Sequence, residues 1–322
     1  MRAMRVMKTG DPSVLQLQDI PQPKPGPGEA MIRVRAAGVN FADTYMRGGA
    51  VPVPLPFTPG IEGAGTVEAV GDGVGEVKPG DRVAYAGRGQ GSYAEFDVMK
   101  AAQLAPLPKE ASFDDGAAAI LQGMTAHYLL HGFYPVQRGS TVLVHAAAGG
   151  MGLILVQWLK HLGAVAIGTV STEEKAQIAR EAGASHVIIY TKQDFAEEVK
   201  KLTGGKGVDY VIDGVGKTTF TKNLDALRNR GWATVFGMAS GPADPVVPNS
   251  LMMKSLTISG GALFNFIVTR EELLQRAGDV FKGLREGWLK LRISHTFPLE
   301  QAAEAHRLLE GRQTVGKLIL KT

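Results

Sequence analysis

Short runs of apolar and β-branched residues, broken by glycine and proline, fill the first part of the chain. Residues 30–37, 65–70 and 82–86 are runs of this kind. The segments between them include 21–28 and 77–81, which are rich in proline and glycine. Closely spaced strands with such breaks are typical of an all-β unit. We therefore expect a barrel-like β unit at the start of the chain.

The pattern changes from Ser112 onward, where strand-like runs alternate with segments of helical periodicity. Ser112 and Asp115 have the spacing of a capping box, which predicts a helix up to about His131. Repeated β-α-β units then predict a doubly wound parallel sheet. The expected strands are 141–145, 165–170, 187–190, 208–213, 232–236 and 256–259, and the expected helices are 150–162, one capped by 171–174 and stopped at Gly183, 194–202 and 217–229.

The last part of the chain predicts a return to the first unit. It contains an expected helix at 271–287, a strand at 293–297, a helix at 300–310 and a strand at 317–321. A sheet domain inserted into a β unit fits this order. The expected domains are 1–122, 123–264 and the returning segment 265–322.

A glycine-rich turn at 142–152 carries the strongest local motif. It follows an expected strand and opens an expected helix, which is the setting that a dinucleotide site requires. Glycine lets the backbone approach a pyrophosphate, and the helix start offers free N–H groups. Ala147 stands where the first glycine of the usual pattern would be, and a turn that serves packing alone is the alternative. The expected cofactor-binding residues here are Gly149, Gly150, Met151 and Gly152.

The second strand of the alternating region indicates which nucleotide is bound. Enzymes that use NAD commonly carry an acidic residue about 20 residues on, where it holds the ribose 2′-hydroxyl. Residues 168–172 contain no acid, and Lys175 follows in the next helix. Thr169, Ser171 and Lys175 therefore suit a 2′-phosphate, which predicts NADPH rather than NADH. The alternative for Lys175 is an ordinary solvated helix residue.

Composition and charge narrow the function classes. The chain has no cysteine, which excludes disulfides and metal sites built from thiolates. Its net charge of +4 is small and unclustered, so no nucleic-acid partner is expected. The basic start is not followed by an apolar stretch of about 7–15 residues, so we expect no signal peptide and a soluble, cytoplasmic protein.

Several motifs together resemble one family over essentially the whole chain. That family is the zinc-free NADPH:quinone oxidoreductases, the zeta-crystallin-like branch of the medium-chain dehydrogenases/reductases. The resemblance implies a GroES-like, β-barrel-type catalytic domain and a Rossmann domain, which makes an α/β protein. The motifs lie at residues 36–45, 59–65, 78–83, 122–126, 145–152 and 316–317.

The chain departs from the zinc-dependent members of this wider family at three places. Asn40 stands where they carry a cysteine ligand, and Ile61 stands where they carry a histidine. Their cysteine-rich lobe would follow Ala86, where this chain continues through 87–92. The resemblance therefore implies no metal. Hydride transfer to an electron-poor acceptor remains, because such an acceptor delocalises the charge without a Lewis acid.

The resemblance also implies the site residues. Asn40, Asp43 and Tyr45 are the expected catalytic residues, with Asn40 and Tyr45 as hydrogen-bond donors to a substrate oxygen and Asn40 also near the cofactor. Asp43 as a helix cap and Tyr45 as a packing residue are the alternatives. Further expected cofactor contacts are Thr125, Tyr190, Val215, Gly216, Phe236, Gly237, Met238, Ser240, Phe264, Asn265 and Lys317.

These expectations lead to an NADPH:quinone oxidoreductase acting on a small molecule. An enone or alkenal double-bond reductase is the close alternative. An RNA-binding or crystallin-like protein that keeps a nucleotide site is the alternative from another class. A homodimer is expected, with residues 256–263 as its seam. His145 closes a buried strand, and we expect its role to be structural.

Overall fold

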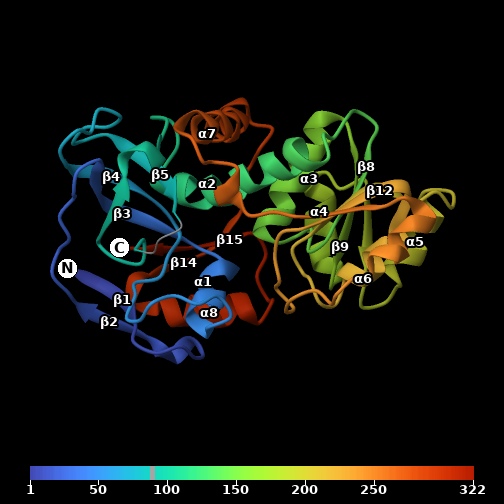
Figure 1. Cartoon of the computed structure of the whole chain (residues 1–322), viewed down its shortest axis with the longest axis horizontal. Coiled ribbons are helices and arrows are strands. Elements are labelled where there is room, and N and C mark those ends of the chain that lie inside the picture. Colours follow the sequence, from blue (N-terminus) through green and yellow to red (C-terminus); the bar gives the residue numbers. More distant parts are fainter. Residues whose placement is uncertain (88–90) are drawn as a thin grey trace. The chain divides into compact units, whose positions relative to one another are not determined.

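The computed structural model of the chain describes residues 1–87 and 91–322. It divides into two units (Figure 1). The first unit comprises Met1–Met124, Phe266–Arg285 and Leu291–Thr322, and the second comprises Thr125–Asn265 and Glu286–Lys290. The domain limits expected from the sequence remain a prediction. Of the segment 87–92, residues 88–90 lie outside the described residues.

The first unit is built around one mixed sheet. Its strands are β3 (Glu29–Val39), β4 (Glu62–Val70), β5 (Arg82–Ala86), β6 (Phe96–Lys100), β7 (Leu104–Pro106), β14 (Ile293–Pro298) and β15 (Lys317–Lys321). They follow the order β14-β15-β3-β4-β5-β7, and β6 pairs with β3. A Cβ on Gly65 of β4 would lie 2.1 Å from the carbonyl oxygen of Arg33, so the close approach of β3 requires glycine there.

The remaining elements of this unit surround the sheet. A hairpin of β1 (Arg2–Val6) and β2 (Leu15–Asp19) forms a separate small sheet. A buried core of the first unit includes Val34, Val39, Tyr93 and Leu318, all nearly inaccessible to solvent. The helices described in this unit are α1 (Phe41–Gly48), most of α2 (Phe113–Tyr128), α7 (Arg270–Glu286) and α8 (Ala302–Glu310), with short turns η1 (Pro12–Val14), η2 (Ala101–Gln103) and η6 (Leu299–Gln301).

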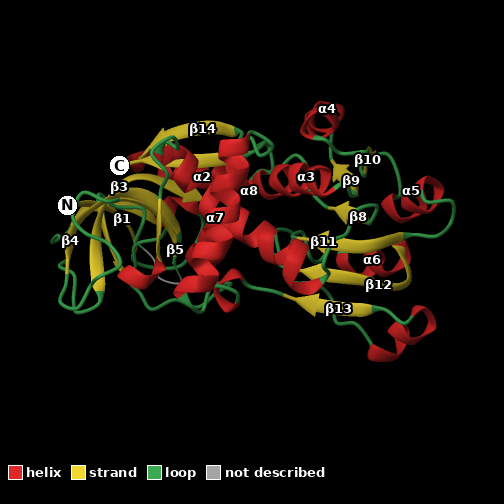
Figure 2. Ribbon diagram, turned by 90° about the horizontal axis from the view of Figure 1, so that it is seen from above, coloured by secondary structure: helices red, strands yellow, loops and turns green. Residues whose placement is uncertain are grey.

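The second unit contains a parallel sheet. Its strands are β8 (Thr141–Val144), β9 (Val165–Val170), β10 (His186–Ile189), β11 (Val208–Asp213), β12 (Leu227–Val235) and β13 (Thr257–Gly260). Figure 2 shows them in the order β10-β9-β8-β11-β12-β13. Because the order reverses beside β8, this sheet has the arrangement of a doubly wound nucleotide-binding fold. The expected parallel sheet is confirmed.

Helices connect these strands. They are α3 (Gly150–Leu162), α4 (Glu173–Ala182), α5 (Phe195–Leu202) and α6 (Phe220–Ala226), with turns η4 (Pro248–Lys254) and η5 (Leu263–Asn265). Leu143, Ile167 and Val211 lie in the buried core of the sheet, which explains why the strands read as continuous apolar runs. In the described part of the chain, no helix is long and apolar enough to cross a membrane.

Two expected helices differ from the structure. The helix expected at 217–229 is wrong at both ends, because α6 spans only Phe220–Ala226 and residues 227–229 already belong to β12. Leu227 pairs with Val208 of β11, and the Nε of Arg228 lies 2.5 Å from Oδ1 of Asp209. The helix expected up to His131 is α2 (Phe113–Tyr128), which continues as a π-helical turn, η3 (Leu129–Phe133).

Candidate active site

The turn between β8 and α3 presents backbone N–H groups at the helix start. Ala146 has a φ of 52°, which turns the chain sharply after the strand. Gly149 is the N-cap of α3, and in the described residues no side chain caps that end and no acid occupies its first turn. The positive end of the helix is thus open to an anion. A Cβ on Gly152 would lie 2.3 Å from the carbonyl oxygen of Ala146, so this turn requires glycine.

The residues expected to bind a 2′-phosphate lie in β9, just after it, and in the first turn of α4. Ser171 and Lys175 are partly buried at the tip, and Thr172 caps α4 by accepting the backbone N–H of Lys175 at 3.2 Å. Burial lowers the pKa of Lys175. Thr169 lies deeper, because it is 1% exposed and its hydroxyl is 2.9 Å from Nδ1 of His145. The structure therefore separates Thr169 from the other two.

The end of β11 is shaped by a buried carboxylate. Oδ1 of Asp213 accepts the N–H of Val215 at 2.7 Å and that of Gly216 at 3.1 Å. Gly216 has a φ of 88°, in the region that favours glycine. The Ser240 hydroxyl donates to the carbonyl of Val215 at 2.8 Å. This hydrogen bond thus connects the loop after β11 to the loop after β12.

The other residues expected to bind the cofactor are spread over the second unit. Gly237 and Met238 follow β12, next to Phe236, and Phe264 and Asn265 lie in η5 after β13. Tyr190 follows β10 and is 47% exposed. Thr125 is buried in α2 rather than at a strand end. Most of the set therefore gathers where the parallel strands end, the edge at which such sheets bind ligands.

In the first unit, Lys317, Asn40 and Glu62 form a buried cluster. Nζ of Lys317 lies 2.6 Å from Oε2 of Glu62 and 2.7 Å from Oδ1 of Asn40. The amide nitrogen of Asn40 donates to Oε2 of Glu62 at 2.9 Å and to the carbonyl of Gly38 at 3.2 Å. Both N–H groups of this amide are thus used within the protein, which does not favour the expected donation from Asn40 to a substrate.

Asp43 is in the first turn of α1, the helix that follows Asn40. Its carboxylate accepts the backbone N–H of Asn40 at 2.9 Å and that of Ile61 at 3.2 Å. The Tyr93 hydroxyl donates to it at 3.2 Å, and His306 is 3.1 Å from that hydroxyl. Complete burial raises the pKa of Asp43 to about 7. Asp43 forms a capping box with Asn40, as its alternative role proposed.

Tyr45 lies on α1, the helix that also carries Asp43. It is partly buried on α1, and its ring centroid lies 6.2 Å from that of Phe41. Because Asp43 and Tyr45 are two residues apart, they lie on different faces of the helix. The structure thus joins Asn40, Asp43 and Lys317.

Three residues near Asn40 and Asp43 were not identified from the sequence as site residues: Glu62, Tyr93 and His306. Glu62 belongs to a quoted motif, 59–65, so its position in that motif was a usable signal. Tyr93 and His306 contact Asp43 directly or through one another, but no local motif marks them. They are found only through tertiary contact.

Comparisons with known proteins agree with this architecture. The family model described as "Alcohol dehydrogenase GroES-like domain" matches residues 26–109, and the one described as "Zinc-binding dehydrogenase" matches 150–278. The quinone oxidoreductase of Pseudomonas aeruginosa is 44% identical over 313 residues, which are 97% of this chain and 96% of that protein. The chain belongs to the quinone oxidoreductase family.

Two further comparisons extend this result. The 2-haloacrylate reductase of a Burkholderia species is 45% identical over 324 residues, covering 98% of this chain and 97% of that protein. The crystal structure of Escherichia coli quinone oxidoreductase complexed with NADPH matches with a TM-score of 0.98 at 41% identity, over the whole of both chains. The expected family and fold class are thus confirmed.

One family model is described as zinc-binding, but the residues of this quinone oxidoreductase family member do not suit zinc. The Ile61 side chain has no ligand atom, and the Asn40 amide is bonded to Lys317 and Glu62. The chain has no cysteine. Among the described residues, no group of three histidine, cysteine, aspartate or glutamate side chains is arranged to hold a metal.

Proposed function

We propose that this chain is an NADPH-dependent reductase that transfers hydride to quinones. The observation that carries the proposal is the match, over the full length of both chains, to a quinone oxidoreductase complexed with NADPH. Relatives named quinone oxidoreductase at 42–44% identity support it.

The second unit provides a fitting cradle for the nucleotide. The uncapped start of α3, with Gly149 as its N-cap, suits the pyrophosphate. Ser171 and Lys175 at the end of β9 suit the 2′-phosphate, since no acid stands between residues 168 and 172 to repel it. The bound nicotinamide would supply the hydride. The loop held by Asp213 would contact the sugar and nicotinamide end.

The first unit contributes positioning groups. Lys317 and Glu62 fix the Asn40 amide, and Asp43 holds the backbone at the start of α1. These contacts set the position of α1 and thereby of Tyr45. We propose Tyr45 as the hydrogen-bond donor to the substrate oxygen. A quinone that takes up hydride gains negative charge on oxygen, so a neutral donor there stabilises the transition state.

A second function, reduction of a conjugated carbon–carbon double bond, is favoured by one specific observation. The relative that is 45% identical over nearly the whole chain is a 2-haloacrylate reductase. An activated alkene accepts hydride by the same electronic principle as a quinone, with the negative charge delocalised onto its carbonyl. Loops set specificity independently of the fold, so both acceptor classes are compatible with this architecture.

An NADPH oxidation assay across quinones and enones tests both functions. We expect turnover with quinones, formation of the hydroquinone, and a lower KM for NADPH than for NADH. A saturated carbonyl product from enones, with no turnover of quinones, would support the second function instead. Absence of NADPH oxidation with every acceptor, despite a folded protein, would contradict both.

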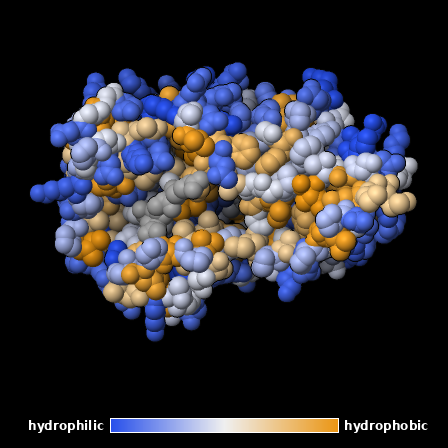
Figure 3. Space-filling view, in the orientation of Figure 1, coloured by the Kyte–Doolittle hydropathy of each residue, from blue (hydrophilic) through white to orange (hydrophobic). Residues whose placement is uncertain are grey.

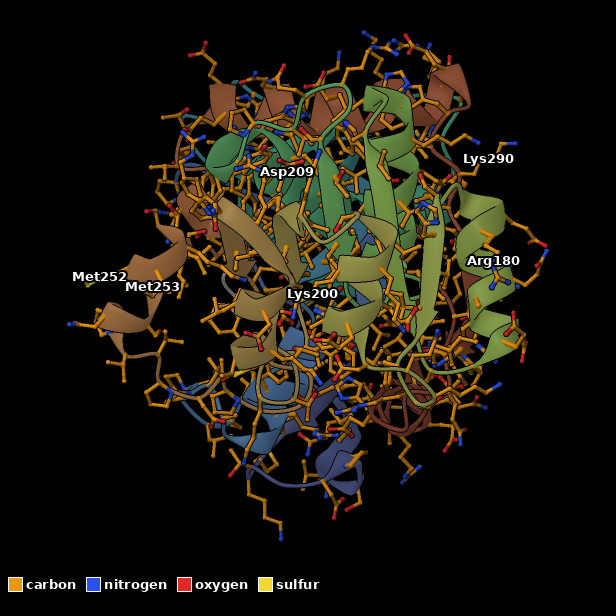
Figure 4. The ribbon with its side chains drawn as sticks, turned by 90° about the vertical axis from the view of Figure 1, so that its right-hand side faces the viewer. Arg180, Lys200, Asp209, Met252, Met253 and Lys290 are labelled. Atoms are coloured by element: carbon orange, nitrogen blue, oxygen red, sulfur yellow. The ribbon has the colours of Figure 1, made fainter. Side chains whose placement is uncertain are left out.

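We also propose a cytoplasmic homodimer that does not bind nucleic acid. β13 is an edge strand of its sheet, and the neighbouring η4 carries Met252 and Met253, which are 70% and 91% exposed. Figure 4 shows both methionines projecting outward from this segment. Figure 3 shows apolar residues gathered in patches among polar ones on this face. An exposed apolar pair beside an edge strand supports an interface.

Light scattering coupled to size-exclusion chromatography tests the assembly. The wild type is expected at twice the chain mass, and Met252→Glu/Met253→Glu at a lower mass at equal concentration. A monomeric wild type would contradict the dimer. Retention of RNA at physiological salt would contradict the absence of nucleic-acid binding.

A further inference from the structure

Both ring nitrogens of His145, the residue after β8, have hydrogen-bond partners. Nε2 lies 2.7 Å from Oδ1 of Asn223 in α6, and Nδ1 lies 2.9 Å from Oγ1 of Thr169 in β9. The ring is 6% exposed and packs edge-on against Phe195 with centroids 4.9 Å apart. His145 therefore bridges two elements from inside the unit.

The chain of hydrogen bonds continues to Asp213. Nδ2 of Asn223 lies 2.6 Å from Oδ2 of Asp213, and that oxygen also accepts the Thr219 hydroxyl at 2.7 Å. Together with the N–H groups of Val215 and Gly216, four donors point at this buried carboxylate. In all four contacts the carboxylate oxygens accept the hydrogen bond.

The order of donors fixes the protonation of the histidine. Because Asn223 gives its N–H to Asp213, its oxygen faces His145 and requires a proton on Nε2. Burial lowers the pKa of His145, which keeps the ring neutral. Nδ1 then carries no proton and accepts a hydrogen bond from the Thr169 hydroxyl.

The three strands that this hydrogen-bond network joins, β8, β9 and β11, each lead into a loop of the candidate nucleotide site. The glycine turn follows His145, and its Ala147 N–H donates to the Thr169 carbonyl at 3.0 Å. Ser171 follows Thr169 after one residue. Asp213 holds the N–H groups of Val215 and Gly216 in the third loop. One line of hydrogen bonds thus connects three loops.

We propose that His145 is a positioning residue for the nucleotide: by bridging Thr169 and Asn223, it fixes the spacing of the three loops that bind NADPH. The inference rests on the proposed function, because it assigns the network to that cofactor. A role in stability alone would leave the affinity for NADPH unchanged when the network is interrupted. The two roles are therefore separable by experiment.

Thr169→Val interrupts the network with little change in side-chain shape. We expect it to raise the Kd and KM for NADPH about tenfold, by loss of one buried hydrogen bond, while kcat changes by less than about twofold. Thr169→Ser keeps the hydroxyl and should restore wild-type binding. Thr234→Val is the matched control, since Thr234 is equally buried in β12 and its hydroxyl bonds to Tyr210 and Ser259. It should lower Tm without changing Kd.

The histidine itself has a spectroscopic signature. Nitrogen-15 NMR, with the His145 signals identified by their absence in His145→Gln, should show a protonated Nε2 and a bare Nδ1 in the wild type. A proton on Nδ1 would overturn the proposal, and so would a Thr169→Val variant that lowers Tm but binds NADPH normally. Failure of the wild type to bind NADPH would instead refute the proposed function, and the cofactor role with it.

Discussion

Lys317 and Glu62 form a buried ion pair, with Nζ 2.6 Å from Oε2, although 255 residues separate them in the chain. The two side chains are 4% and 0% exposed. Burial of one charge is tolerable here because the other charge and the Asn40 amide satisfy it. The pair joins β15 to β4 across the intervening β3.

Removing one partner of this ion pair should lower the free energy of unfolding more than removing both. Lys317→Met leaves the Glu62 carboxylate buried without its cation, so we expect the free energy of unfolding to fall by about 3–5 kcal/mol in urea titrations. Adding Glu62→Gln to this variant removes the orphaned charge and should regain part of the loss. A double variant that is less stable than the single one would contradict this account.

The sequence predicts most of the second unit but little of this cluster. Gly163 and Gly183 end α3 and α4 in the left-handed conformation, and Thr172 caps α4, so local signals set those limits. The observed bounds of α3 equal the predicted ones. His145, expected at the end of a buried strand, is indeed buried with a hydrogen-bond partner for each ring nitrogen.

The polar cluster of the first unit depends on contacts between distant segments. Lys317 and Asn40 are 277 residues apart, and His306 lies 213 residues from Tyr93. No periodicity or capping rule relates such positions, and Lys317 comes close to Asn40 only when β15 pairs with β3. The sequence therefore predicts an Asn40 amide that faces the substrate, whereas in the structure this amide faces Glu62 and Lys317.

Stability should depend on pH through two buried carboxyl groups. Burial raises the pKa of Asp97, like that of Asp43, from 3.8 to about 7. Between about pH 4 and pH 7 the folded protein therefore keeps protons that the unfolded chain has released, so the free energy of unfolding falls as pH rises, by at most about 1.4 kcal/mol per pH unit for each group.

Asp97→Asn removes one of these groups while keeping a similar shape. Its free energy of unfolding, measured in urea across this pH range, should fall less steeply than that of the wild type. The exposed Asp72→Asn serves as the control and should follow the wild-type curve. An Asp97→Asn curve parallel to the wild type would show that Asp97 does not titrate in this window.

Cofactor preference should depend on Lys175. Lys175→Ala removes the ammonium in the first turn of α4, so we expect the KM for NADPH to rise about tenfold with little change for NADH. Lys201→Ala is a suitable control because Lys201 is 70% exposed and pairs with Glu198 on α5. Equal effects of Lys175→Ala on both cofactors would refute its role at the 2′-phosphate.

Two glycine substitutions should act in opposite directions. Gly152→Ala places a Cβ against the Ala146 carbonyl and should lower both Tm and NADPH affinity. Gly278→Ala in α7 meets open space, so we expect it to raise the free energy of unfolding by about 0.5–1 kcal/mol through helix propensity. Thermal melts and NADPH titrations distinguish the two, and an unaffected Gly152→Ala would contradict the described turn.

The position of β15 between β3 and β14 sets the order in which the two units are completed during synthesis. The sheet of the second unit has all its strands once residue 260 has emerged from the ribosome. The first unit begins earlier but lacks a central strand until residue 321 is made. The first unit is therefore finished last, and the edge of β3 that pairs with β15 is without that partner until then.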